Sequence, residues 1–320
     1  MATPFPNHQP HGVIPACLLP FHDDLSIDAA AYRAHIRDVG ATRGITAITV
    51  NAHASEVSSC DVEEQDEVLD LTLQEIGDRL PVIAGVYADG SLQAARLAKR
   101  AAAGGASALL LFPPNVLARG AQQRPENLAA HVKAVADATD LPLIIFQYAQ
   151  ATGLTYPLPT LLRLAEEVPT FRALKDGCAD PVLHERTVLA LQGLRRPVNV
   201  LSTHSAWLLS SLATGCNGLL SGSGSIIAGL HVQIYEAVRR GDMAAAQAAN
   251  ALIAPTAEVF YAAPLFDMHN RMKEALVMLG RMPRATVRPP LRKLADAEIA
   301  RIRTAIQAAG LLDRDRVAAE

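Results

Sequence analysis

Short apolar runs alternate with longer amphipathic segments along most of the chain. The runs are rich in Val, Ile and Leu and predict eight strands, at residues 12–21, 44–52, 80–88, 107–114, 141–149, 171–177, 198–205 and 215–224. Their apolar residues are continuous rather than alternating, which is typical of strands buried on both faces of a parallel sheet. Nearly every run is followed by a segment with apolar residues at helical spacing, so the pattern predicts repeated strand–helix units.

Several of the intervening segments carry the residues that start and stop helices. The clearest helical patterns lie at residues 27–40, 91–105 and 125–139. Asp28, Ser91 and Pro125 lie where first turns are expected, and Gly40 and Gly104 lie where helices would end. Repeated strand–helix units of this kind predict an α/β fold, the TIM (β/α)8 barrel, whose chemistry sits at the carboxyl ends of the strands.

The strand pattern stops near the end of the third quarter of the chain. Residues 241–320 contain helical patterns only. We therefore predict a (β/α)8 barrel catalytic domain at residues 1–240 and a C-terminal helical extension at residues 241–320. The apolar faces of this extension could pack on the barrel or on another subunit, and the pattern leaves both possibilities open.

Composition and charge narrow the class of protein. Half of the 320 residues are hydrophobic and 19% are charged, which is typical of a globular protein with a sizeable core. The net charge of -3 argues against a nucleic-acid-binding surface. No stretch predicts a membrane span or a secretory signal, and the four cysteines lack the spacing of a metal or redox motif, so we expect a cytoplasmic protein.

Lys175, in the run FRALKDG, is the only lysine of the five that falls on a predicted strand. Burial disfavours the charged ammonium group, and a neutral amine can attack a carbonyl carbon to form an imine. The alternative is a buried lysine paired with an inward-facing carboxylate, and the position alone does not separate the two. Asp176 follows directly and would face the other side of the strand.

The motifs around these strands resemble those of a known family. PACLLPF, NAHASEVSSCDVEEQ, FQYAQATG, ALKDG and NGLLSGSGS follow the order and spacing of the dihydrodipicolinate synthase / N-acetylneuraminate lyase family of class I aldolases over residues 12–310. The resemblance implies that Lys175 forms a Schiff base with pyruvate or another 2-oxo acid. It also implies that the backbone amides of Ala54 and Ser55 hold the substrate carboxylate. A cofactor-free homotetramer, built as a dimer of dimers, is the assembly that the resemblance implies.

The chain departs from this family at the proton relay. His53 occupies the position of the relay threonine, and Phe146 that of the relay tyrosine of the fifth strand. The tyrosine expected after the fourth strand is absent, and Ala151 replaces an arginine, so we do not expect dihydrodipicolinate synthesis. His53, with an ordinary pKa of about 6.5, is the best placed base. Tyr148 would face the same way as Phe146 and is the competing proton carrier.

Two other groups of polar residues are weaker candidates. Ser221 and Gly222, in the turn after the eighth strand, could contact the bound imine. A metal set of His53, His184 and His204 lacks a supporting carboxylate–histidine spacing, so we expect no metal ion.

The sequence thus predicts a class I lyase that forms a Schiff base between Lys175 and a pyruvate-like 2-oxo acid and cleaves or forms a C–C bond. Two alternatives stay open. One is a 2-keto-3-deoxy sugar acid dehydratase that uses the same imine, and the other is a non-catalytic paralogue that binds a 2-oxo acid.

Overall fold

The core of the fold is a barrel of parallel strands. The computed structural model describes residues 3–312. Within these residues the strands follow the order β1-β8-β7-β6-β5-β4-β3-β2. Isolated parallel bridges from Val13 to Ile45 and from Ala16 to Thr49 join the two ends of the sheet. The predicted TIM barrel is confirmed, and each strand lies inside its predicted run: β1 (Gly12–Pro15), β2 (Ile48–Val50), β3 (Val82–Val86), β4 (Ala108–Leu111), β5 (Leu143–Gln147), β6 (Phe171–Asp176), β7 (Asn199–Ser202) and β8 (Gly218–Ser221).

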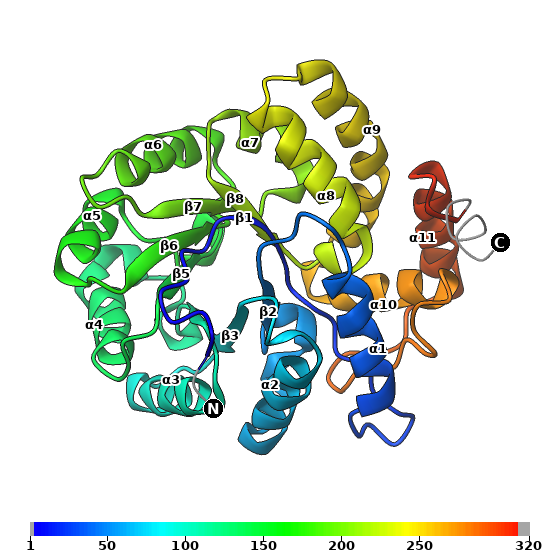
Figure 1. Cartoon of the computed structure of the whole chain (residues 1–320), viewed down its shortest axis with the longest axis horizontal. Coiled ribbons are helices and arrows are strands. Elements are labelled where there is room, and N and C mark those ends of the chain that lie inside the picture. The colour runs from blue at the N-terminus through cyan, green and yellow to red at the C-terminus, as the bar shows by residue number, and fades with distance from the viewer. Residues whose placement is uncertain (1–2, 313–320) are drawn as a thin grey trace.

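A helix follows each strand, and together these helices form a ring outside the sheet (Figure 1). They cover the outer face of the strands, which explains why nearly every strand residue is buried whichever way it points. The Asp28 side chain begins α1 as expected, since it accepts a hydrogen bond from the Ala31 amide at 3.0 Å. The helices are α1 (Ala29–Gly40), α2 (Val62–Ile76), α3 (Ser91–Gly104), α4 (Pro125–Ala136), α5 (Leu158–Glu167), α6 (Pro181–Gln192), α7 (Leu208–Ala213) and α8 (Gly224–Arg239).

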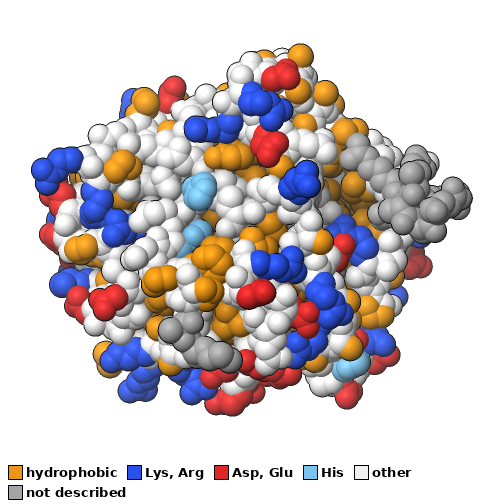
Figure 2. All heavy atoms as spheres, viewed as in Figure 1, with side chains coloured by type: hydrophobic (Ala, Val, Ile, Leu, Met, Phe, Trp, Pro, Cys, Tyr) orange, Lys and Arg blue, Asp and Glu red, His pale blue; other side chains and the backbone are white. Residues whose placement is uncertain are grey.

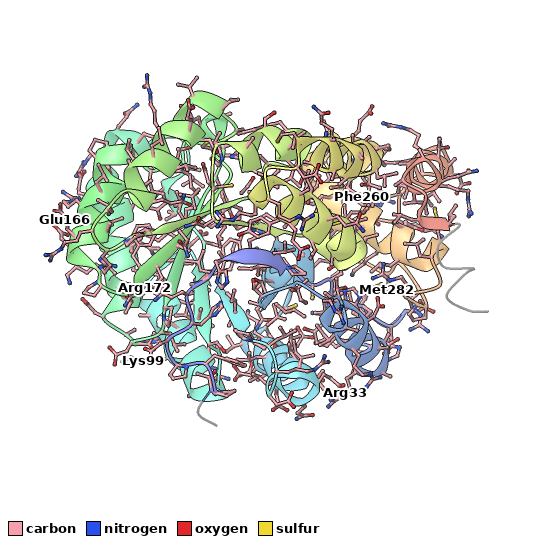
Figure 3. The ribbon with its side chains drawn as sticks, turned by 45° about the horizontal axis from the view of Figure 1, so that its top comes forward. Arg33, Lys99, Glu166, Arg172, Phe260 and Met282 are labelled. Carbon is pink, nitrogen blue, oxygen red and sulfur yellow. The ribbon has the colours of Figure 1, made fainter. Side chains whose placement is uncertain are left out.

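Within residues 241–312, three further helices follow the barrel: α9 (Met243–Phe260), α10 (Met268–Met278) and α11 (Asp296–Ala308). Helix α9 packs along α8 and against α11. Figure 3 shows Phe260, at the end of α9, and Met282, after α10, on the same side of the barrel. This part of the chain therefore packs on the barrel, one of the two possibilities that the sequence left open. The division into domains at residue 240 stays a prediction, and residues 313–320 lie outside the described part.

The segment before β1 crosses the amino-terminal opening of the barrel (Figure 1). The Asn199 side chain donates to the Pro10 carbonyl at 2.8 Å, and the Thr3 hydroxyl lies 2.8 Å from that of Ser107. On the face drawn in Figure 2, basic and acidic side chains are interspersed around the margin. The carboxyl ends of the strands lie on the opposite face, where the candidate residues gather. No helix in residues 3–312 is long and apolar enough to cross a membrane.

Candidate active site

All the predicted site residues lie at the carboxyl end of the barrel. Lys175 is the penultimate residue of β6, and Tyr148 directly follows β5. A short 3-10 turn after β2, η1 (His53–Ser55), carries His53 together with Ala54 and Ser55. Ser221 ends β8 and Gly222 follows it. Four strand ends thus contribute to one region, as expected for a TIM barrel.

Lys175 is buried without an ionic partner. Its side chain is 6% exposed, and its Nζ lies 4.0 Å from the centroid of the Phe146 ring. Among the described residues its amine has neither a hydrogen bond nor an ion pair. Burial lowers the pKa of Lys175 from its ordinary value of 10.5 to about 7. This lowered pKa makes the uncharged amine, the form that attacks a carbonyl carbon, far more abundant near neutral pH than it is for an exposed lysine.

A second lysine is also buried, but it is paired. Lys273 on α10 is fully buried, forms an ion pair with Glu56, and donates to the Thr286 carbonyl at 2.8 Å. Glu56 also accepts from the Arg288 amide at 3.0 Å. The sequence predicted the helix that carries Lys273 but not its burial. The paired-lysine alternative considered for Lys175 therefore describes Lys273 instead. Lys99 on α3 lies at the periphery (Figure 3) and is exposed, as are Lys133 and Lys293.

His53 and Tyr148 form one hydrogen-bonded pair. His53 Nε2 lies 2.5 Å from the Tyr148 hydroxyl, and the His53 ring packs edge-on against Phe112 at a centroid distance of 4.7 Å. Burial, with smaller effects from His269 and Lys175, lowers the pKa of His53 to about 3. Burial also raises the pKa of Tyr148 well above its ordinary value. At neutral pH an uncharged phenol and an uncharged imidazole therefore share this hydrogen bond.

This geometry corrects one expectation. The ordinary histidine pKa expected for His53 is wrong, because the surrounding aromatic rings shield most of the imidazole from water. The expected orientation of Tyr148 is confirmed, since its ring centroid lies 4.7 Å from that of Phe146. Phe146 contacts the Lys175 amine on one side and the His53–Tyr148 pair on the other. Lysine, phenylalanine and the pair therefore form one continuous cluster.

The turn that carries His53 depends on a close backbone approach. Asn51 has a φ of 52°, and a Cβ at Gly85 in β3 would lie only 1.8 Å from the Asn51 carbonyl oxygen. Glycine at position 85 is thus required for the turn to reach its place. Within the described residues the Ala54 amide makes no hydrogen bond, whereas the Ser55 amide donates to the Ala52 carbonyl at 3.0 Å. Of the two predicted carboxylate donors, only the Ala54 amide is unengaged.

The turn after β8 meets the turn after β2. A Cβ at Gly222 would lie 3.6 Å from the Cβ of Ala54, so the two predicted binding segments are in contact. The Ser221 hydroxyl lies 3.0 Å from the Tyr261 hydroxyl, which also accepts from the Ser223 amide at 3.2 Å. Tyr261 was not predicted from the sequence, because nothing in the helical pattern around it indicates a contact with β8.

The histidines of the hypothetical metal set fall into two different groups. His184 Nδ1 lies 2.7 Å from Asp176, and His204 Nε2 lies 3.7 Å from the same carboxylate, whereas His53 belongs to the cluster beside Lys175. Although burial alone would lower it, the hydrogen bond to Asp176 raises the pKa of His184 to about 9. Asp176, on the strand face opposite Lys175, also accepts from the Gln147 side chain at 3.0 Å, so its hydrogen bonds join α6 and β5 to β6.

Comparison with known proteins identifies the family. The model of the dihydrodipicolinate synthetase family matches residues 9–309. The chain belongs to this family. A probable 5-dehydro-4-deoxyglucarate dehydratase of Saccharopolyspora erythraea is 32% identical over 288 residues, which cover 88% of this chain and 87% of that protein. A 4-hydroxy-tetrahydrodipicolinate synthase of Gluconacetobacter diazotrophicus is 28% identical over 303 residues, covering 94% and 98%.

Solved structures of dihydrodipicolinate synthetase family members share the fold. A monomeric dihydrodipicolinate synthase variant superimposes with a TM-score of 0.88 at 21% identity, covering 97% of this chain and 99% of that one. A prophage protein of E. coli K12, described in complex with pyruvate, gives a TM-score of 0.85 at 23% identity, covering 94% and 99%. Since named relatives in the family are synthases and a dehydratase of the lyase class, the chain is an enzyme of lyase type.

Proposed function

We propose that this protein is a class I lyase that forms a Schiff base between Lys175 and a pyruvate-like 2-oxo acid. The observation that carries the proposal is the buried, unpaired amine of Lys175 with a pKa of about 7. The other buried lysine, Lys273, is held by Glu56 and cannot act as a nucleophile without breaking that ion pair. The pyruvate described in the E. coli relative is consistent with a 2-oxo acid ligand.

The proposed chemistry uses the imine as an electron sink. The amine of Lys175 attacks the C2 carbonyl, and loss of water gives a protonated imine. In C–C cleavage a base removes the proton of the C4 hydroxyl, the C3–C4 bond breaks, and its electron pair enters the imine to give an enamine. Protonation at C3 and hydrolysis then release pyruvate and restore the lysine. Condensation is the reverse of this sequence.

Proton transfer is assigned to the His53–Tyr148 pair. The hydroxyl of Tyr148 accepts a proton from the substrate while its own proton passes to His53 Nε2, along the 2.5 Å hydrogen bond. The Ala54 amide is proposed to bind the substrate carboxylate, with the Ser55 amide joining it if its bond to Ala52 opens. Ser221 and Gly222 are proposed to contact the imine from the side of β8.

Dihydrodipicolinate synthesis is not part of the proposal. Phe146 carries no hydroxyl, and Ala151 carries no positive charge for a second substrate, so condensation of pyruvate with aspartate semialdehyde is not expected. The second candidate is dehydration of a 2-keto-3-deoxy sugar acid through the same imine, favoured by the similarity to the probable dehydratase. The unpaired Lys175 argues against a purely non-catalytic paralogue. A cytoplasmic homotetramer without a cofactor stays a prediction.

Covalent trapping tests the proposal. Incubation with pyruvate and borohydride should add one reduced pyruvyl group to each chain, located on the peptide that contains Lys175. Lys175→Ala should abolish the adduct, whereas the matched control Lys99→Ala, at an exposed lysine, should retain it. An adduct that maps to any other lysine, or no adduct with intact folded protein, would disprove the Schiff-base assignment.

A further inference from the structure

A pocket of about 350 Å³ opens beside His53 at the carboxyl end of the barrel. Its walls come from the turns after β2, the end of β3, residues 265–269 and residues 288–291. His53 both lines this pocket and contacts Phe146, whose ring covers the Lys175 amine. The rings of His53 and Phe146 therefore lie between this pocket and the Lys175 amine, and the inference below places the substrate chain beyond C3 on the pocket side of these rings.

Much of the wall of this pocket is apolar. Leu265 and Phe266 stand at its rim with 54% and 63% of their surfaces exposed, so both side chains are available to a ligand. The Tyr87 ring and residues 289–291, two prolines and a leucine, complete the wall. Side chains of this kind gain free energy when an apolar ligand group covers them.

The two charged residues in the wall are already neutralised. The carboxylate of Glu56 is ion-paired with Lys273 and accepts from the Arg288 amide. The guanidinium of Arg288 donates to Glu64 at 2.6 Å, to the Ser59 carbonyl at 2.8 Å, and to the Leu25 carbonyl at 2.9 Å. Neither group can bind a ligand ion without giving up these partners.

The two histidines in the wall do not supply a positive charge at neutral pH. Burial lowers the pKa of His53 to about 3 and that of His269 to about 4. Among the described residues that line the pocket, no cation is therefore available for a second carboxylate. An ionised group placed there would lose its hydration without gaining a partner, which is strongly unfavourable.

We infer that the substrate carries an uncharged, apolar group, such as a phenyl ring or a branched aliphatic chain, on the carbon beyond C3. This inference rests on the proposed function, because it places the 2-oxo acid end on Lys175. The reaction joins C3 of the pyruvate enamine to the carbonyl carbon of an apolar aldehyde, and the resulting alkoxide takes a proton. Hydrolysis of the imine then gives a 4-hydroxy-2-oxo acid. The named glucarate-type substrate of the probable dehydratase carries a second carboxylate, so we expect the two proteins to differ in specificity.

Two synthetic substrates test whether the enzyme prefers an apolar or a charged distal group. The purified enzyme is given 4-hydroxy-2-oxo-4-phenylbutanoate or 4-hydroxy-2-oxoheptanedioate, which share the reacting end and differ in the distal group. Consumption of each is followed by chromatography, so that both C–C cleavage and loss of water are counted. We expect kcat/KM for the phenyl compound to exceed that for the dicarboxylate by at least about tenfold, a usual range for apolar pockets.

A pair of variants links the preference to the pocket. Phe266→Arg adds a cation at the rim and should lower the preference by at least about tenfold, mainly through KM, while trapping of pyruvate on Lys175 is unchanged. The matched control is Leu92→Arg, since Leu92 is an exposed apolar residue (76%) on α3 that does not line the pocket. This variant should keep the preference of the parent enzyme.

The results of trapping and of substrate consumption test the proposed function and this inference separately. Failure of trapping on Lys175 would overturn the proposed function, and the inference with it. Trapping combined with equal or faster consumption of the dicarboxylate, or with no consumption of the phenyl compound, would overturn the inference alone. A preference that Phe266→Arg leaves unchanged would also overturn it, because the rim would then not be the selecting surface.

Discussion

Replacing the unpaired lysine by an uncharged side chain of similar length should make the protein more stable. In Lys175→Met the flexible thioether fills the volume of the lysine stem, so little packing is lost. What disappears is the cost of holding an ammonium group under the Phe146 ring without a partner. The enzyme should at the same time lose all trapping by pyruvate and borohydride.

The size of the gain follows from the pKa of the lysine. A tenfold change in proton affinity corresponds to about 1.4 kcal/mol. The fall from 10.5 to about 7 therefore corresponds to about 5 kcal/mol, which is an upper limit because a folded chain relaxes around a buried charge. We therefore expect Lys175→Met to raise the free energy of unfolding by about 2–5 kcal/mol. In a chain of 320 residues this raises Tm by about 3–8 °C.

The pH dependence gives the sharper test. Below pH 7 both the folded and the unfolded wild-type chain carry the protonated lysine, so the whole cost is present. Between pH 7 and 10.5 the folded chain loses this proton while the unfolded chain keeps it, so wild-type stability rises with pH. The advantage of Lys175→Met should therefore be largest at or below pH 7 and should shrink toward pH 10.

Thermal and urea unfolding of both proteins at pH 6, 7, 8 and 9 would measure the difference. Lys99→Met is the control, since Lys99 is exposed and its replacement should leave Tm unchanged at every pH. A Lys175→Met variant that is less stable than the wild type, or that shows the same difference at all pH values, would refute the argument. The amine would then be charged and paired by a contact that the folded chain makes in solution.

Three other predictions concern the same cluster and its support. Lys273→Met should destabilise the protein by about 3–5 kcal/mol in urea unfolding, because it leaves the buried Glu56 carboxylate unpaired; a neutral or stabilising effect would show that Glu56 takes up a proton instead. His53→Ala should lower the turnover rate by about 10²–10⁴-fold and keep the Lys175 adduct, and Tyr148→Phe should do the same, since the two residues act as a unit; full activity in either variant would separate them. The rate of imine trapping should rise through about pH 7 and then level off, as the Lys175 amine loses its proton; a rate that keeps rising toward pH 10 would show that the amine keeps its ordinary pKa.

The barrel could be predicted because each strand is marked by residues that are neighbours in the sequence. Strands covered on both faces need continuous apolar runs, and these runs stand out at every strand. The ends of the strands cannot be placed as accurately from these runs. Strand β2 is only three residues long although its apolar run covers 44–52, because Asn51 adopts a left-handed conformation and turns the chain into the site. That conformation depends on the contact with Gly85 of the next strand, which no property of residues 44–52 reveals.

The position of Lys175 was predictable for the same local reason, whereas its electrostatic state was not. An isolated lysine on a buried strand can be neutral or paired, and the answer depends on which carboxylates face it. The carboxylate after the second strand, Glu56, pairs instead with Lys273, 217 positions away in the chain. Helical periodicity shows that α10 has a buried face but not which barrel residue that face meets. The sequence shows Glu56 in the run AHASEVSS but gives no indication that this carboxylate is buried or which cation it meets.

The missing proton relay and the unexpected histidine pKa have a common physical cause. The fold brings Tyr87, Phe112, Phe146 and Tyr148 around His53 from the ends of three neighbouring strands. These rings shield the pair from most of the solvent, which makes the imidazole a weak base on its own and the phenol a weak acid on its own. Through their hydrogen bond the phenol can give its proton to the imidazole as it receives one from the substrate, so the positive charge of the imine passes to His53 as the enamine forms, and the number of charges in the site does not change. A proton carrier made from two neutral groups suits an apolar site, and the same rings that shape the pocket for an apolar substrate make such a carrier necessary.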